Sequence, residues 1–501
     1  MYYSLEMRLT RCLPLPAREP APRSRMRSPS VISSMIMISP TLAQWIALWV
    51  LSLVFVGRSC RNAYRWVDGC SGNSCALPVG HCWRFPSVAD GWTGKPDRQN
   101  QETRSVPADS QSDNFDRFHI EPQLLRERAF NLRWATVDPD VIPLTAADPD
   151  FPVAHEIRQA IAAHAAEGVL GYGPTEGFDG FRAAVARMLS SRSVSARPDQ
   201  ILATDGAASA LWAACRAVLG PGDEALTFDP IDFLLPHCSE QAGATVVRCP
   251  LERGTWVIAE GALEQRITEH TRAILLCNPH NPTGRVLRVD ELRRIGDLAI
   301  AHDLVIINDE VWADIILGDV EMTSIASLSP EIAERTITVS GFSKSYGLAG
   351  LRIGFIHSGS ESLCRRVLEA SGAPRTTFGA SVLSQVAAQA ALEHCDSWLA
   401  GFLDHLRQMR TMAVARLDAL PGVCCRAPEG TYLLFPDIRK TGFDAQALAQ
   451  RLHDEARVAV VPGLMEWFGP GAEGHLRLSF ATTEQILDEA LTRIEKMLVG
   501  G

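Results

Sequence analysis

A glycine-bounded stretch with one lysine constrains this chain more than any other feature. Residues 336–339 are apolar or β-branched and predict a buried strand, after which small residues favour a turn. Lys344 lies in that turn, and Arg352 follows in a second glycine-bounded turn. A lysine at the end of a buried strand is poorly solvated, so its pKa should fall and its neutral amine can attack a carbonyl. A lone lysine after a strand is usually a surface residue, so this interpretation depends on the surrounding motifs.

Those motifs give the stretch a family resemblance. Residues 336–354 resemble the segment of class I and II aminotransferases whose lysine forms a Schiff base with pyridoxal 5'-phosphate (PLP), and the other signature segments follow in family order between residues 147 and 481. The resemblance implies the α/β fold of fold-type I PLP-dependent transferases. It predicts an N-terminal arm (115–160), a large PLP-binding domain with a mainly parallel seven-stranded sheet (161–375) and a smaller α+β C-terminal domain (376–501).

Length, charge and cysteine content narrow the class of protein. A chain of 501 residues with 46% hydrophobic residues can bury the cores of two or three domains. Its net charge of −10, without a long Lys/Arg run in the body, argues against a nucleic-acid partner. The 13 cysteines show no CxxC pair or zinc-ligand spacing, so we expect reduced thiols and no metal.

The first 114 residues differ in composition from the rest. Residues 8–27 carry six arginines among prolines and serines, and residues 41–57 form an uncharged apolar run just short of a spanning length. Three interpretations stay open: a translation begun upstream of the true start, a membrane anchor, or a targeting peptide. We expect the catalytic body to be cytoplasmic, with membrane contact only if residues 41–57 act as an anchor.

A strand-to-helix turn predicts a phosphate site. Residues 200–204 read as a strand, and small residues after Asp205 open a helix, whose backbone N–H groups and dipole favour a bound dianion. Where the family often has Ser or Thr, position 341 is glycine, and Ser343 is the nearer hydroxyl. The resemblance assigns phosphate contacts to Gly206, Ala207, Ala208, Ser343 and Arg352.

A tyrosine segment implies a homodimer. Tyr172 lies in the glycine-rich stretch 171–177, which resembles the family segment whose tyrosine reaches the cofactor phosphate of the neighbouring subunit. Alone, Tyr172 would more often be a packing residue. The resemblance implies that it acts across a dimer interface.

Two further motifs are similar to those that hold the cofactor ring. The loop 278–284 (NPHNPTG) follows an apolar strand, and its second asparagine, Asn281, would donate to the phenolic oxygen. Asp309 ends the next strand and would pair with the ring nitrogen, which keeps the ring an electron sink.

Two positions depart from the family pattern around the ring. The family usually has an aromatic residue at position 232 and often a tyrosine at position 312, whereas this chain has Asp232 and Trp312. Either the turn shifts by one residue and Phe233 stacks on the ring, or the ring face is covered in another way; we favour Phe233.

The substrate carboxylate is assigned to an arginine on a late strand. Residues 428–437, 458–463 and 475–481 predict short strands, and Arg477 alternates with apolar neighbours in the last of them. A buried arginine can bind a carboxylate through two hydrogen bonds. The resemblance gives this role to Arg477 and places the loop that contains Asp148 over the substrate.

The resemblance implies transfer of an amino group between an L-amino acid and a 2-oxo acid, with Lys344 as the base that moves the α-proton. A carbon–sulfur lyase of the cystathionine β-lyase kind is the alternative, because residues 168–172, 278–282, 309–312 and 429–433 resemble that branch. A third hypothesis is a sensor or transcriptional regulator that does not catalyse a reaction. We disfavour it because no helix-turn-helix pattern precedes the body.

Overall fold

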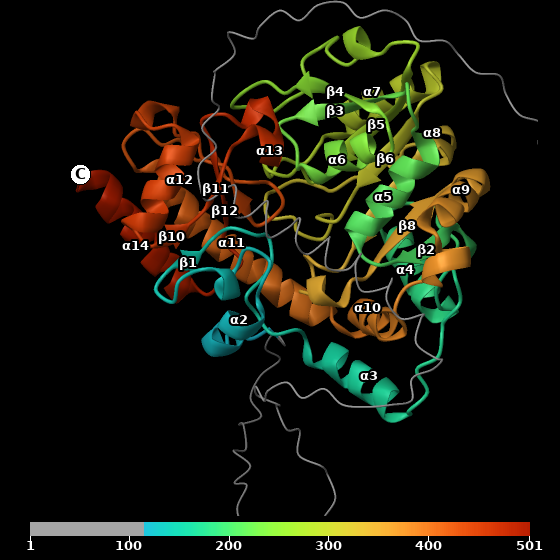
Figure 1. Ribbon diagram of the computed structural model, residues 1–501, viewed down its shortest axis with the longest axis horizontal. Coiled ribbons are helices and arrows are strands. Elements are labelled where there is room, and N and C mark those ends of the chain that lie inside the picture. The colour runs from blue at the N-terminus through green and yellow to red at the C-terminus, as the bar shows by residue number, and fades with distance from the viewer. Residues whose placement is uncertain (1–114, 501) are drawn as a thin grey trace, which may run out of the picture. The chain divides into compact units, whose positions relative to one another are not determined.

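A seven-stranded sheet carries most of the predicted signature segments (Figure 1). The computed structural model describes residues 115–500, so the expectations for residues 1–114, including the apolar run 41–57, lie outside the described residues. The strand order is β2-β8-β7-β6-β5-β3-β4; β8 is antiparallel to both its neighbours and the other pairs are parallel. The predicted mainly parallel sheet is confirmed. The strands are β2 (Ile201–Thr204), β3 (Glu224–Asp229), β4 (Thr245–Pro250), β5 (Thr271–Cys277), β6 (Val305–Asp309), β7 (Thr336–Gly341) and β8 (Gly354–Ser358).

Both faces of the sheet are buried, which explains the uninterrupted apolar runs of its central strands. In β5, Leu275 belongs to one hydrophobic core, whereas Ile274 and Leu276 belong to a second. The first core includes residues of α5 and α9, and the second includes residues of α7 and α8. The helices are α5 (Ala207–Val218), α6 (Leu234–Gln241), α7 (Val289–Ala301), α8 (Pro330–Arg335) and α9 (Glu361–Ser371).

The C-terminal part contains smaller sheets. An antiparallel sheet has the order β11-β12-β9, and β1 pairs in parallel with β10. Figure 1 shows β1 among these late elements, so the segment before the large sheet returns to the C-terminal part. The strands are β1 (Ile142–Pro143), β9 (Leu433–Leu434), β10 (Val458–Ala459), β11 (Val461–Pro462) and β12 (Leu476–Ser479).

Helices connect and cover these sheets. Before β2 come α2 (Pro122–Arg128), α3 (His155–Ala166) and α4 (Asp179–Ser191); after β8 come α10 (Val382–His394), α11 (Asp396–Asp418), α12 (Ala445–Asp454), α13 (Met465–Phe468) and α14 (Glu484–Val499). No helix within residues 115–500 is both long and apolar enough to cross a bilayer.

The parallel register brings the signature loops together. Cys277 at the end of β5 lies opposite Asp309 at the end of β6, and Asp309 lies opposite Val339 of β7. The loops after these strands therefore leave the sheet at one edge, where ligands of open α/β sheets bind.

Candidate active site

Lys344 lies in the turn that follows β7. Its Nζ donates a hydrogen bond to the carbonyl oxygen of Ala147 (2.7 Å) and lies 5.5 Å from the centroid of the Trp312 ring. Burial lowers the pKa of the Lys344 amine, and the nearby carboxylates of Asp148 and Asp232 partly oppose this shift. The lowered pKa favours the neutral amine, which is the nucleophilic form.

Asp309, at the end of β6, lies beside this amine. Its Oδ1 accepts a hydrogen bond from the backbone N–H of Val311 (3.0 Å). Burial raises the pKa of the Asp309 carboxyl to about 7, and the nearby charge of Asp232 adds to the shift. A cation bonded to Asp309, such as a protonated ring nitrogen, would favour its ionised form. The Asp309 carboxyl is therefore chemically suited to bind the protonated nitrogen of a PLP ring.

Asn281 and Arg477 meet next to Asp232. The Asn281 Nδ2 donates to Asp232 Oδ2 (2.7 Å), and its Oδ1 accepts from Arg477 (3.3 Å). Arg477, on β12, also donates to the carbonyl of Thr145 (3.3 Å) and is only 8% exposed. Its Nε is buried without a hydrogen-bond partner among the described residues, and the Asp232 carboxylate is 3.9 Å from its guanidinium. Arg477 therefore retains hydrogen-bonding capacity for a further carboxylate.

The loop before α3 lies against the lysine and is firmly held. The buried Arg133 forms an ion pair with Asp150, and Trp134 donates its indole N–H to the same carboxylate (2.8 Å). The Asp150 N–H donates to the Ala481 carbonyl (3.1 Å), which joins the loop to the end of β12. Asp148 is half-buried there, and burial raises the pKa of its carboxyl while Lys344 opposes the shift.

The first turn of α5 forms a cup at the sheet edge. Gly206 has φ +91°, and a Cβ added there would lie 3.1 Å from the Arg352 guanidinium. That guanidinium donates to the Asp205 carbonyl (3.2 Å). A Cβ on Gly354 would come within 2.7 Å of the Ala207 nitrogen, so β8 approaches the helix this closely only with glycine. First-turn N–H groups of a helix have no acceptor within the helix, so the cup fits a phosphate.

The remaining predicted residues are placed less directly. Ser343 is half-buried in the lysine turn. Phe233 directly precedes α6, is 38% exposed and meets the Trp467 ring edge-on, with centroids 5.7 Å apart. Tyr172 is 88% exposed and packs against the Phe378 ring at 5.4 Å. Their assigned roles stay predictions.

Tyr432 is a site neighbour that the sequence did not reveal. Its hydroxyl donates to the Ala147 carbonyl (3.1 Å), the acceptor that also binds Lys344. The Tyr432 and Trp312 rings meet edge to face at 4.7 Å, and both side chains are buried. They form an aromatic wall beside the lysine. The stretch 429–433 had indicated only a family branch, because the contact to Ala147 spans 285 residues.

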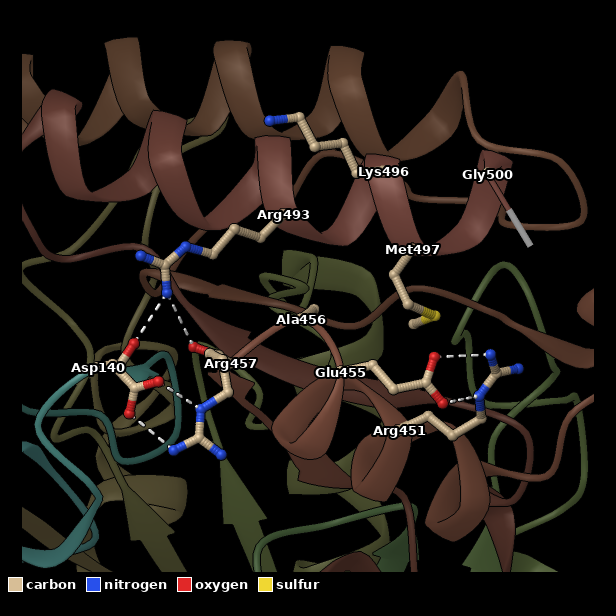
Figure 2. A pocket seen from close by; sticks show the side chains of 9 residues that line it. All are labelled: Asp140, Arg451, Glu455, Ala456, Arg457, Arg493, Lys496, Met497 and Gly500. Carbon is tan, nitrogen blue, oxygen red and sulfur yellow. Dashed lines mark hydrogen bonds and ion pairs between the residues drawn. The ribbon is translucent and has the colours of Figure 1, made fainter.

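A surface hollow between α12 and α14 is a separate feature (Figure 2). Its three arginines are bound by neighbouring groups: Arg457 pairs with Asp140, Arg451 with Glu455, and Arg493 with Glu489. None of the predicted site residues lines it. We assign it no ligand.

Comparisons with known proteins decide the family. A family model for aminotransferases of class I and II matches residues 139–494. The chain belongs to this family. The putative aminotransferase YugH of Bacillus subtilis is 34% identical over 361 residues, which are 72% of this chain and 92% of that protein. The probable aspartate/prephenate aminotransferase of Aquifex aeolicus is 34% identical over 394 residues, 76% of this chain and 97% of that protein.

Solved structures support the same family assignment. The aromatic aminotransferase of Pyrococcus horikoshii superposes with a TM-score of 0.68 at 32% identity, over 72% of this chain and 97% of that one. Cystalysin of Treponema denticola, which contains a PLP cofactor, superposes with a TM-score of 0.71 at 25% identity, over 78% of this chain and 99% of that one. The predicted fold type, aminotransferase activity and PLP cofactor are confirmed. These comparisons do not support a carbon–sulfur lyase better than an aminotransferase.

Asp309→Asn should stabilise the cofactor-free protein as pH rises. Burial raises the pKa of Asp309 from 3.8 to about 7, so the folded chain keeps a proton that the unfolded chain has released. Wild-type stability therefore falls between about pH 4 and pH 7, whereas an asparagine escapes this loss. We expect the variant's thermal midpoint to exceed that of wild type by about 5 °C at pH 8, with a smaller gain near pH 5.

Asp404→Asn, an exposed carboxylate on α11, is the matched control and should show no such pH-dependent gain. Equal midpoints for Asp309→Asn and wild type across this pH range would contradict the assignment of the raised pKa.

Proposed function

We propose that this aminotransferase exchanges the amino group of a free L-amino acid with a 2-oxo acid, and that Lys344 both binds PLP covalently and moves the α-proton. One observation carries the proposal: the Lys344 amine, Asp309, Asn281 and Arg477 meet at one edge of the sheet. An amine, a buried carboxyl and a buried guanidinium are the groups that this reaction needs.

Three elements would hold the cofactor. Asp309 would hold the ring nitrogen in its protonated form, and Asn281 would donate to the phenolic oxygen. The α5 cup, with Gly206, Ala207 and Ala208, would bind the phosphate together with Arg352 and the Ser343 hydroxyl. Bound PLP supplies an electron sink that stabilises the negative charge left when the α-proton is removed.

The chain's own residues then position the substrate and the proton. Arg477 would bind the α-carboxylate, because its Nε has no hydrogen-bond partner within residues 115–500 and its other hydrogen bonds go to uncharged oxygens at 3.3 Å. Lys344, whose pKa burial lowers, would take the proton from the α-carbon and deliver it to the cofactor. The loop that contains Asp148 would cover the substrate, and Phe233 would pack on the ring.

We also infer a division of the body into an arm (115–160), a large domain (161–375) and a small domain (376–501).

We further infer that the protein is a homodimer. Large apolar side chains are exposed around Tyr172: Val169 is 76% exposed, Leu170 56% and Phe378 50%. Such side chains at one place suit a surface that a second copy covers. Tyr172 would then reach the partner's phosphate.

Arg477→Lys should lower kcat/KM for the best amino acid by about 100-fold, because a lysine cannot bind a carboxylate through two parallel hydrogen bonds. Steady-state kinetics with single amino acids and one 2-oxo acid would measure it. Arg451→Lys makes the same chemical change in an exposed ion pair on α12 and should leave kcat/KM unchanged. Equal kinetics for Arg477→Lys and wild type would remove Arg477 from substrate binding.

A hybrid dimer tests the placement of Tyr172. Lys344→Ala and Tyr172→Ala chains with different affinity tags would be co-expressed, and the mixed dimer purified through both tags. If Tyr172 acts on the partner's site, one of the two sites in the hybrid has both residues, and about half of wild-type activity returns. If Tyr172 acts within its own chain, no site is complete and the hybrid is no more active than half of the Tyr172→Ala dimer.

A further inference from the structure

Asp232 places a fixed carboxylate beside the substrate-carboxylate site. It lies between β3 and α6, where its Oδ1 accepts from the Leu234 N–H (3.1 Å) and its Oδ2 from the Asn281 amide (2.7 Å). These two bonds hold the carboxylate in one orientation. Its side chain is 16% exposed, so water screens its charge only partly.

This carboxylate acts on the groups that the proposed reaction uses. It lies 3.9 Å from the Arg477 guanidinium, and its charge raises the pKa values of Asp309 and Lys344. An amino acid bound to Arg477 would therefore have its α-carbon within a few bond lengths of Asp232. Its side chain, in whichever direction it extends, would lie in the field of this negative charge.

The local charges indicate which side chains this field favours. Three carboxyl groups (Asp148, Asp232 and Asp309) and two cationic groups (Lys344 and Arg477) influence one another at the site. The cofactor ring would offset Asp309, and the substrate α-carboxylate would offset Arg477. Arg133, behind the loop, is already paired with Asp150. The excess charge that remains is negative.

We propose, on the basis of the proposed function, that Asp232 is a specificity-determining residue that favours amino acids with a cationic side chain and disfavours those with a second carboxylate. Asp232 would repel a distal carboxylate and attract a distal cation. An aromatic residue at this position would exert no such discrimination by charge.

The test compares three ligands with a five-carbon chain that lack an α-amino group and so do not react: pentanoate, glutarate and 5-guanidinopentanoate. Their dissociation constants for the PLP-loaded enzyme would be measured by calorimetry. We expect 5-guanidinopentanoate to bind about tenfold more tightly than pentanoate, and glutarate about tenfold more weakly, each equivalent to about 1.4 kcal/mol. In Asp232→Asn both ratios to pentanoate should approach one.

Asp404→Asn removes an exposed carboxylate from α11 and should keep the wild-type ratios. A merely structural role for Asp232 would change the affinity for all three ligands together and leave the ratios intact, which would overturn the proposal. So would wild-type enzyme that binds glutarate more tightly than pentanoate, a result that needs no variant.

A separate reaction distinguishes failure of this inference from failure of the proposed function. Wild-type enzyme would be mixed with single amino acids, and conversion of the cofactor to its pyridoxamine form followed by absorbance. If an amino acid reacts while the ligand ratios lack the expected order, the function stands and the role of Asp232 is wrong. If the ratios hold but no amino acid reacts, the proposed aminotransfer is wrong.

Discussion

The parallel register of β5, β6 and β7 is the constraint on which the rest of the site depends. Because β5 and β6 end level with one another and β7 extends beyond them to Gly341, the loop of Asn281, the carboxyl of Asp309 and the amine of Lys344 meet at one edge. The strands are buried on both faces, so the edge is fixed by two hydrophobic cores rather than by the site itself. Because the cores hold the fold together, the charged side chains of the site can be buried even though their burial is unfavourable.

Burial shifts the reactive groups of the site toward their neutral forms. It raises the pKa of Asp309 and lowers that of Lys344. A neutral amine suits nucleophilic attack and proton removal, whereas a carboxyl with a raised pKa gains from a cationic partner. The Asp232 carboxylate lies 3.9 Å from the buried Arg477 guanidinium, which is beyond hydrogen-bond distance. Burying these groups costs free energy. A protonated ring nitrogen bound to Asp309 and a substrate carboxylate bound to Arg477 would offset that cost.

The structural features that could be predicted from the sequence are those that depend on a local pattern of residues. The apolar strands before Asp309 and Lys344, the small residues of the α5 turn and the alternation around Arg477 each follow from periodicity and turn chemistry. Residues 428–437 predict a strand with a glycine turn; the strand is shorter than expected, Leu433–Leu434, and bends around Gly430 precede it.

Contacts between distant segments could not be predicted in this way. Tyr432 meets the Ala147 carbonyl across 285 residues, and Arg477 meets Asn281 across 196. No periodicity encodes such pairs, since tertiary packing alone brings them together. Asp232 was visible as a departure from the family pattern, but its bond to Asn281 required the fold.

The most direct test of this account is the identity of the residue that carries the cofactor. The purified protein would be loaded with PLP, reduced with borohydride, digested and mapped by mass spectrometry. We expect the reduced cofactor to be found on the peptide that contains Lys344. A cofactor attached to Lys440 or Lys496, or to no peptide at all, would contradict it.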